Sequence, residues 1–406
     1  MLSLRATNRH IIGRIPLPSS KSESNRALII QALTPDIVLN NVSSARDTQT
    51  MKRLLQSKDH VLDVIDAGTT MRFLTAYCAA TGKDQLLTGT PRMCQRPIGG
   101  LVAALRTIGA DIRFWKQEGY PPLHTIARTG KLAGGFLEMP GNISSQFISA
   151  VLLISPYFST PLELHLTDGV TSRPYLDMTM SLMRHFGAEV QWGGESVIHA
   201  STTAYQASEY TIESDWSGAS YWYSLLALSE GGELHLDGLK ANSLQGDSDI
   251  ARMMESFGVK TTFTDSGAHL TKFERELPAS LTIDCVETPD LAQTLAVVAG
   301  ALGVDLTMTN LHTLRVKETD RIYALEQELG KFGLSTESAD DRLRVYGTFL
   351  PKETTIHTYE DHRMAMAFAP LAVKLPYLQI DEADVVVKSY PEFWDHMSSV
   401  GLQSSH

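Results

Sequence analysis

The chain has 406 residues, 43% of them hydrophobic and 20% charged, which is ordinary for a globular protein with sizeable cores. The net charge of −11 argues against broad binding to nucleic acids or anionic membranes, but it leaves room for a local site that binds small anions. Cys78, Cys94 and Cys285 lack metal-ligand spacing, and no apolar run suits a signal peptide or a membrane span, so we expect a reduced, cytoplasmic protein.

One local pattern recurs along the chain: a helical run, a glycine that ends it, and an alternating strand. The glycines stand at intervals of 78, 71, 75 and 68 residues, at Gly109, Gly187, Gly258, Gly333 and Gly401. Glycine in the left-handed conformation ends a helix and lets the next strand pack back on it. The long period predicts a repeated unit with a helix or two and several strands. The alternative is chance, because such joins are common in α/β proteins.

In the first half of the chain, several helices are predicted to begin with polar clusters. Lysine, serine, glutamine and arginine at a helix N-terminus suit an anion such as phosphate, because backbone N–H groups and the helix dipole point there. Simple N-capping is the alternative for each cluster. The residues are Lys21, Ser22 and Arg26; Gly68; Arg96; Ser144, Ser145 and Gln146 before a helix at 148–154; and Ser172 and Tyr175 before a helix at 176–186.

The second half repeats this design with more charge. Asp290 stands before a helix at 291–299, where its spacing alone favours an N-cap over a general base. The octet 314–321 holds Lys317, Glu318 and Arg321 ahead of another helical run, and a solvated first turn is its simplest interpretation. Arg363 follows an Asp-His pair, and Lys388 lies near the end of the chain.

Converging helix starts with these side chains would bind a substrate that carries several anionic groups. The chemistry would then be acid–base catalysis by Lys21, Asp290 and Glu318, with no metal and no redox cofactor.

Taken in order, these motifs resemble the 5-enolpyruvylshikimate-3-phosphate (EPSP) synthase family over nearly the whole chain, from Leu17 to Trp394. The motifs are Ser20-Lys21-Ser22 with Ser24-Asn25-Arg26, Ala67-Gly68-Thr69, Arg96-Pro97-Ile98-Gly99, Ser144-Ser145-Gln146-Phe147, Pro289-Asp290, Arg315-Val316-Lys317-Glu318-Thr319-Asp320-Arg321 and Asp361-His362-Arg363-Met364-Ala365.

The resemblance implies an α/β (α+β) fold of two lobes. Each lobe is an inside-out barrel of three β-α-β-α-β-β units, with helices inside and sheets outside. Residues 1–19 and 213–406 would form one discontinuous lobe and residues 20–212 the inserted lobe, with the active site in the cleft between them. The segment 45–66 is short against the family pattern, so we expect the first unit to be abbreviated.

The resemblance also implies the reaction: transfer of the enolpyruvyl group of phosphoenolpyruvate to the 5-hydroxyl of shikimate 3-phosphate, with release of phosphate, by addition and elimination. Asp290 would be the base at the hydroxyl, and Glu318 and Lys21 would move the proton at the methylene carbon. The implied phosphoenolpyruvate contacts are Lys21, Gly68, Arg96, Gln146, Arg321, Arg363 and Lys388. The implied shikimate 3-phosphate contacts are Ser22, Arg26, Ser144, Ser145, Gln146, Ser172, Tyr175, Asp290 and Lys317, with Thr313 added although an asparagine is common there.

We further expect a monomer without cofactors that binds glyphosate as a competitive ligand. Asp66 departs from the family pattern, because an asparagine is usual there, and it adds negative charge near the implied phosphoenolpyruvate site. Ser19 and Phe73 also depart from that pattern.

Two rival hypotheses remain. The chain resembles the sister enzymes that transfer enolpyruvyl to UDP-N-acetylglucosamine with a loop cysteine as acid, but Cys94 lies too close to Arg96 for that loop. A non-catalytic anion-binding relative, or an RNA-binding one, is the other alternative.

Overall fold

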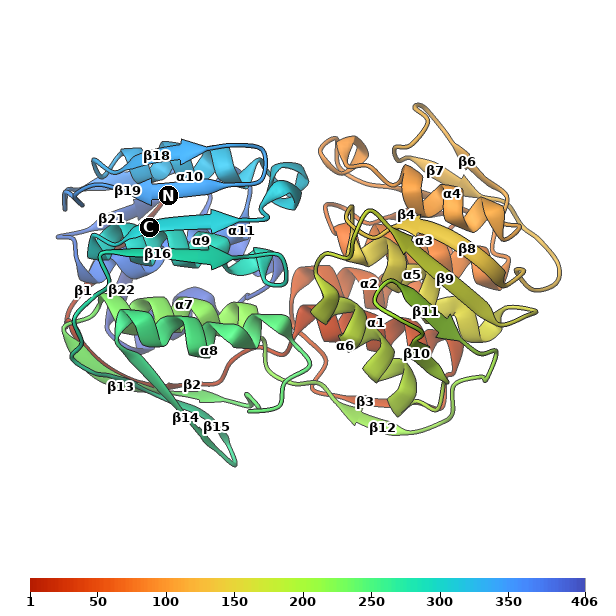
Figure 1. Cartoon of the computed structure of the whole chain (residues 1–406), viewed down its shortest axis with the longest axis horizontal. Helices are drawn as coiled ribbons and strands as arrows, with labels where there is room; N and C mark the ends of the chain where they lie inside the picture. Colours follow the sequence, from red (N-terminus) through yellow and green to blue (C-terminus); the bar gives the residue numbers. More distant parts are fainter. Residues whose placement is uncertain (406) are drawn as a thin grey trace. The chain divides into compact units, whose positions relative to one another are not determined.

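The computed structural model describes residues 1–405, which divide into two compact units. Within these residues, the terminal unit comprises residues 1–19 and 213–405, and the inserted unit comprises Ser20–Ile212. Each unit is built from three sheets with helices between them (Figure 1).

One six-element pattern accounts for most of the chain: a strand, a helix, a parallel strand, a second helix and an antiparallel hairpin. In the inserted unit, the sheet β4-β5-β7-β6 shows it clearly. Its elements are β4 (Val61–Asp63), α3 (Gly68–Thr81), β5 (Gln85–Thr88), η1 (Met93–Gln95), α4 (Gly99–Thr107), β6 (Ile112–Phe114) and β7 (Leu123–Thr125).

The inserted unit holds a second complete copy with the same strand order, β10-β11-β9-β8. Its elements are β8 (Gly135–Pro140), α5 (Ser145–Ile154), η2 (Ser155–Tyr157), β9 (Leu162–Thr167), α6 (Arg173–His185), β10 (Val190–Trp192) and β11 (Val197–Ala200).

The terminal unit holds three complete copies. The first contains β2 (His10–Ile15), α7 (Trp216–Leu228), β13 (Gly231–Asp237), η3 (Gly246–Asp249), α8 (Ile250–Met253), η4 (Met254–Phe257), β14 (Val259–Thr264) and β15 (Gly267–Lys272). The second contains β16 (Ser280–Asp284), η5 (Pro289–Leu291), α9 (Ala292–Leu302), β17 (Asp305–Thr309), η6 (His312–Val316), α10 (Arg321–Gly330), β18 (Ser335–Ser338) and β19 (Leu343–Tyr346). The third contains β20 (Thr354–Ile356), α11 (His362–Phe368), η7 (Ala369–Val373), β21 (Leu378–Ile380), η8 (Ala383–Lys388), α12 (Phe393–Ser399) and β22 (Leu402–Ser405).

The two ends of the chain complete this last copy together. β1 (Leu2–Ala6) pairs antiparallel with both β21 and β22, so the N-terminal strand supplies the second strand of the hairpin (Figure 1).

The remaining copy is abbreviated, as expected from the short segment 45–66. It has only two strands, β12 (Glu209–Thr211) and β3 (Val38–Asn40), with the helices α1 (Lys21–Leu33) and α2 (Arg46–Gln56). After α2 the chain enters β4 within five residues, so this copy lacks the hairpin.

The recurring glycines explain why the repeat was visible in the sequence. Each one precedes the first strand of a hairpin, and all five have positive φ, from +79° to +98°. The side chain of an L-residue is strained in this region, which glycine tolerates. The abbreviated copy has no hairpin and no such glycine, so five glycines mark five complete copies.

Burial confirms the helix-inside arrangement within each unit. Every residue of α11 and every residue of α7 except Ser217 is buried, and so are most residues of α9, α3 and α5. The strands alternate between buried and exposed positions, as β8 does, which is the pattern of a sheet with one face on a core. Within residues 1–405, no helix combines the length and hydropathy needed to cross a lipid bilayer.

Replacing Gly109 by alanine should lower the free energy of unfolding by about 1–2 kcal/mol, because its φ of +98° strains an L-residue and no neighbouring atom lies near the new Cβ. Gly330→Ala is the matched control, since Gly330 lies in α10 without positive φ and also has open space around its Cβ. Thermal unfolding of both variants checks this, and equal midpoints would contradict the role of the recurring glycines.

Candidate active site

A buried cluster of opposite charges in the terminal unit is centred on Arg321, the first residue of α10. Its side chain is only 2% exposed and bonds three carboxylates. Nε donates to Asp361 at 2.7 Å, Nη1 to Asp290 at 3.0 Å and Nη2 to Glu318 at 3.1 Å. The solvated first turn that the octet suggested is therefore wrong for Arg321 and Glu318, which are both largely buried.

The other charged residues of the octet hold the turn in place. Arg315 pairs with Asp320 at 3.1 Å. Asp320 is also the N-cap of α10 and accepts a hydrogen bond from the backbone N–H of Tyr323. These two residues therefore brace the helix start that presents Arg321.

Asp290 is surrounded by cations. Its carboxylate accepts from Arg321 at 3.0 Å and from Arg363 at 2.8 Å, and the Lys317 Nζ lies 3.8 Å away. Burial alone would raise its pKa, but the charges of Arg363, Lys317 and Arg321 outweigh burial and hold the pKa of Asp290 well below its ordinary value. The N-cap interpretation of Asp290 is wrong, since Asp290 lies inside η5, whose N-cap is Thr288, and the N-cap of α9 is Leu291.

Asp361 orients two of these arginines. Its fully buried carboxylate pairs with Arg321 and, as the N-cap of α11, accepts the backbone N–H of Arg363 at 2.8 Å. The Arg363 side chain, 8% exposed, lies against Asp290 with its Nη1 3.4 Å from the Tyr221 hydroxyl. The starts of α10 and α11 and the η5 segment before α9 therefore meet in one charged cluster.

Two more predicted residues lie in the same unit. Lys388 is buried at the end of η8, and Thr313 lies in η6. The Thr313 hydroxyl is buried and has no hydrogen-bond partner within residues 1–405.

Asp247 is a member of this region that the sequence did not reveal. The Ser217 hydroxyl donates a hydrogen bond to it and lies 3.5 Å from the Arg363 Nη2. Burial first, and then the charge of Asp290, raises the pKa of Asp247 well above the ordinary aspartate value. The pKa values of the neighbouring carboxyl groups of Asp247 and Asp290 are thus shifted in opposite directions. Asp247 stands in a polar turn, Gly-Asp-Ser-Asp, which looks like any surface loop.

In the inserted unit, a second group of cations lies around Gly68, the first residue of α3. A Cβ at this position would collide with the guanidinium groups of Arg72 and Arg96. Glycine therefore lets two arginines approach the start of a helix, where backbone N–H groups also point. The sequence predicted Arg96 and Gly68, but Arg72 was not singled out.

Lys21 begins α1, directly after the N-cap Ser20. Its Nζ lies 3.3 Å from the buried carboxylate of Asp47, a partner that the sequence did not indicate because it comes from α2. Ser22 follows Lys21 in the first turn, and its carbonyl accepts a hydrogen bond from Arg26.

Arg26 has a bracing role in the structure. Its guanidinium donates to Thr179 at 2.7 Å and to Ser149 at 3.3 Å, and it lies over the rings of Phe73 and Tyr175. Burial lowers its pKa to about 10. Arg26 thus ties α1 to α5 and α6, and its proposed substrate contact stays a prediction.

The remaining predicted residues stand at two helix starts. Ser144 is the N-cap of α5, which begins at Ser145 and contains Gln146. Ser172 is the N-cap of α6 with a φ of +54°, and Tyr175 lies in its first turn. Both helices begin three residues before the predicted starts at 148 and 176, because the apolar run marks only the buried part and the polar first turn is helical too.

The negative charge of Asp66 is compensated. Arg46, the first residue of α2, places Nη2 at 2.9 Å from both carboxylate oxygens. The departure from the family pattern at Asp66 therefore comes with a local cation, which reduces the repulsion expected at Gly68.

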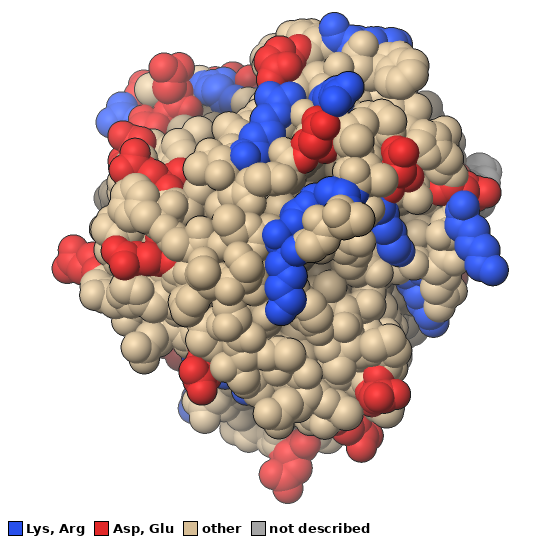
Figure 2. Space-filling model, turned by 90° about the vertical axis from the view of Figure 1, so that its right-hand side faces the viewer, with Lys and Arg blue, Asp and Glu red and all other residues tan. Residues whose placement is uncertain are grey.

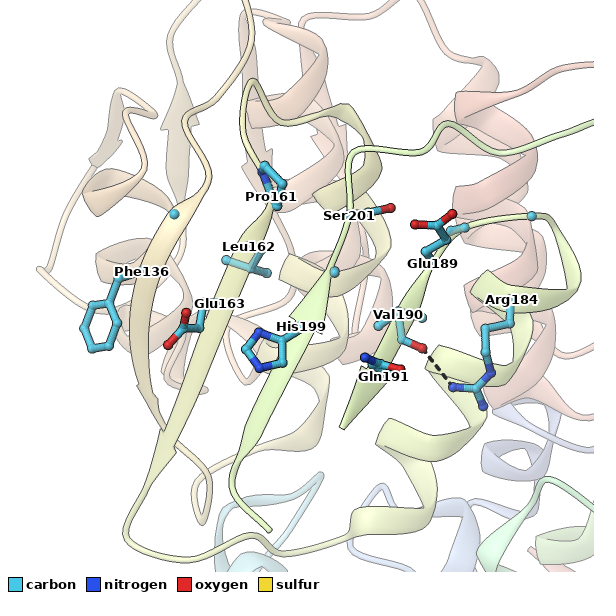
Figure 3. A pocket seen from close by; sticks show the side chains of 14 residues that line it. Phe136, Pro161, Leu162, Glu163, Arg184, Glu189, Val190, Gln191, His199 and Ser201 are labelled. Carbon is cyan, nitrogen blue, oxygen red and sulfur yellow. Dashed lines mark hydrogen bonds between the residues drawn. The ribbon is translucent and has the colours of Figure 1, made fainter. Parts of the chain in front are cut away.

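A surface depression of about 780 Å³ in the inserted unit contains none of the predicted residues (Figure 3). It lies at one end of the sheet β10-β11-β9-β8, with Glu163, His199 and Gln191 on its strands. Arg184 of α6 donates to the carbonyl of Val190 there at 3.2 Å. Because none of its lining residues belongs to the charged clusters around Arg321 and Gly68, we place this depression outside the candidate site.

Replacing Asp247 by asparagine should stabilise the protein increasingly as pH rises. Its raised pKa means that Asp247 takes up a proton more readily in the folded protein, so its contribution to the free energy of unfolding is fully present below the ordinary aspartate pKa of about 3.9 and is lost as pH rises towards neutrality. Denaturant unfolding between pH 4 and 8 would measure the difference between the two proteins. Asp249→Asn is the control, since Asp249 only pairs with Arg252 at the surface. A difference that does not change with pH would contradict the raised pKa.

Comparison with known proteins identifies one family. The family model described as EPSP synthase (3-phosphoshikimate 1-carboxyvinyltransferase) matches residues 52–397. A protein of Bacteroides fragilis named 3-phosphoshikimate 1-carboxyvinyltransferase is 45% identical over 99% of this chain and 98% of its own length. One of the same name from Photorhabdus laumondii is 34% identical, over 98% of each chain.

Solved structures share the fold. EPSP synthase from Acinetobacter baumannii has a TM-score of 0.79 at 20% identity, covering 100% of this chain and 99% of that one. The enolpyruvyl transferase NikO from Streptomyces tendae has a TM-score of 0.76 at 13% identity, covering 100% of this chain and 98% of that one. These matches confirm the two-lobed α/β fold. The family model and the curated relatives show that the chain belongs to the EPSP synthase family.

Proposed function

We propose that this protein transfers the enolpyruvyl group of phosphoenolpyruvate to the 5-hydroxyl of shikimate 3-phosphate and releases phosphate. Membership of the family supports the reaction. The observation that carries its mechanism is the cluster at Arg321, where a buried carboxylate is kept ionised beside cations that can bind substrate anions.

Phosphoenolpyruvate carries a phosphate and a carboxylate, and arginine and lysine bind both strongly. In our proposal Arg321, Arg363 and Lys388 contribute from the terminal unit. The inserted unit contributes Lys21, Gly68, Arg96 and Gln146.

Shikimate 3-phosphate carries a phosphate, a carboxylate and ring hydroxyls, so it needs both hydroxyl donors and cations. The helix starts of α1, α5 and α6 suit these groups, because hydroxyls and backbone N–H groups gather there. The proposed residues are Ser22, Arg26, Ser144, Ser145, Gln146, Ser172, Tyr175, Asp290, Lys317 and, less strongly, Thr313.

The reaction then proceeds in two steps. Asp290 accepts the proton of the 5-hydroxyl while the hydroxyl oxygen bonds to C2 of phosphoenolpyruvate. In the same step, Lys21 or Glu318 delivers a proton to the methylene carbon. The tetrahedral intermediate collapses when Lys21 or Glu318 takes a proton back from the new methyl group and the C2–O bond to phosphate breaks. The proton held by Asp290 then leaves with the phosphate, which restores both groups. One proton added and one removed at that carbon leave the enolpyruvyl group intact.

Substrate binding should make Asp290 a better base. Without ligand, the arginines hold its pKa low. Substrate anions would share those cations, so the pKa of Asp290 would rise toward the range that suits proton transfer. Cations around a carboxylate therefore serve both binding and activation.

Because the proposed contacts come from both units, we infer that substrates draw the units together around the site. Glyphosate, a phosphonate and carboxylate, would compete for the phosphoenolpyruvate contacts. A monomer in the cytoplasm remains our expectation.

The rival hypotheses gain no support from the residues concerned. Cys94 is partly buried, with its Sγ 3.6 Å from the carbonyl of Gly89. On the face drawn in Figure 2, acidic and basic side chains both occur and wide uncharged areas separate them, unlike the continuous basic surface that RNA binding needs.

Purified protein should release phosphate from phosphoenolpyruvate when shikimate 3-phosphate is present, and glyphosate should inhibit this release. UDP-N-acetylglucosamine should not replace shikimate 3-phosphate. Cys94→Ser should leave turnover within about twofold, because a cysteine outside the cluster takes no part in the proton transfers. Phosphate release only with UDP-N-acetylglucosamine would favour transfer of the enolpyruvyl group to that nucleotide sugar. Loss of turnover in Cys94→Ser would favour the same reaction. No release with either acceptor would favour a non-catalytic protein.

A further inference from the structure

Two histidines and an aspartate lie together on the sheet β4-β5-β7-β6, outside the proposed active site. They are His60 directly before β4, Asp84 directly before β5, and His124 in β7. One ligand atom from each lies within 4.8 Å of the others. Three adjacent strands therefore supply one donor each.

The pairing of the strands explains how residues so distant in sequence meet. β4 and β5 run parallel, so His60 and Asp84 stand at the same end of the sheet. β7 runs antiparallel to β5 with His124 opposite Leu86. The neighbours of His124 in β7, Leu123 and Thr125, are buried, so alternation turns His124 to the outer face.

Hydrogen bonds already orient two of the donors. His60 Nδ1 lies 3.2 Å from the carbonyl of Asp84, which suits a ring protonated at Nδ1 with its lone pair on Nε2. Metal-binding histidines commonly have such a carbonyl partner for the second ring nitrogen. His124 Nε2 and the Asp84 carboxylate are hydrogen-bonded to each other, so a cation could take the place of the proton between them.

We propose that His60, Asp84 and His124 form a binding site for a divalent transition-metal ion, with zinc as the representative. Two imidazoles and one carboxylate, with no thiolate, are a donor set that zinc accepts while keeping a position for water. Tetrahedral ligands at about 2.0–2.2 Å from zinc stand roughly 3.3 Å apart, so small side-chain rotations would complete the site.

The surroundings allow both entry and rotation. His60 and Asp84 are exposed, and the His124 side chain is 23% exposed. Arg113 of β6 lies opposite His124 in the sheet register, and its charge is paired with Asp111 at 2.9 Å.

The expected role is structural. Zinc would link the starts of β4 and β5 to β7, whereas Gly68 and Arg96 follow the other ends of β4 and β5. Zinc should therefore raise the melting temperature of the inserted unit and leave turnover unchanged.

Tag-free, metal-stripped protein with reduced cysteines should bind one Zn²⁺ per chain at this site in calorimetry, with a rise in melting temperature. His60→Ala, His124→Ala and Asp84→Asn should each weaken binding by at least about tenfold, the loss already caused by removing a partner of a metal ligand. Substituted Co²⁺ should give visible bands in the wild type that the His124→Ala variant lacks.

His165→Ala is the matched control. His165 also lies on a central strand, β9, between two buried neighbours and beside a carboxylate, with Nε2 2.7 Å from Glu163, but it belongs to no group of three donors within residues 1–405. This variant should keep the binding and the Co²⁺ spectrum. The proposal would be overturned if His165→Ala lost as much zinc affinity as the ligand variants. It would also be overturned if His60→Ala and His124→Ala bound zinc as tightly as the wild type while their metal-free melting temperatures matched the wild type.

Discussion

The buried contact between Arg321 and Asp361 constrains much of the terminal unit. Neither side chain is more than 2% exposed, so the buried charge of Asp361 needs Arg321 for compensation, while Arg321 also pairs with Asp290 and Glu318. Removing one partner of such a pair typically costs about 3–5 kcal/mol, because a buried charge is left alone. The contact also joins the starts of α10 and α11, which present Glu318, Arg321 and Arg363. The positions of these three side chains thus follow from one interaction.

The cluster also shows how a site for anions can exist in a folded protein without ligand. Asp290, Glu318 and Asp361 neutralise Arg321 and Arg363, which we propose as substrate contacts, so these two arginines are buried together with counter-charges. In the inserted unit, Asp47 does the same for Lys21. Substrate anions would then compete with the carboxylates of the protein itself, and a displaced carboxylate such as Asp290 would become more basic. Binding and acid–base chemistry are linked through the same cations.

The sequence predicted those features that depend on neighbouring residues. Gly258 ends a helix and starts a hairpin with a positive φ, so the repeat could be read from it and its counterparts. The abbreviated copy was predicted from the short segment 45–66 against the family pattern. Polar residues such as Ser144 and Ser172 marked helix starts, because they occupy the N-cap positions of α5 and α6. The sequence failed where partners lie far apart. Asp290 looks like an N-cap locally, but Arg363, 73 residues later, decides its role. Asp247 became visible only through Ser217 and Asp290, and the resemblance to the family, rather than spacing, assigned the substrate contacts.

The most direct test is the Asp290→Asn variant, measured for both turnover and phosphoenolpyruvate binding. Asparagine keeps the shape but cannot accept the proton, so turnover should fall by about 10²–10⁴-fold. Binding should be no weaker than in the wild type, because Arg321 and Arg363 lose an anion that competes with the substrate. Asp305→Asn is the control. It removes a carboxylate on β17 that pairs with Arg344 of β19, and it should change neither turnover nor phosphoenolpyruvate binding. Wild-type turnover in Asp290→Asn would contradict the role of this carboxylate as the base.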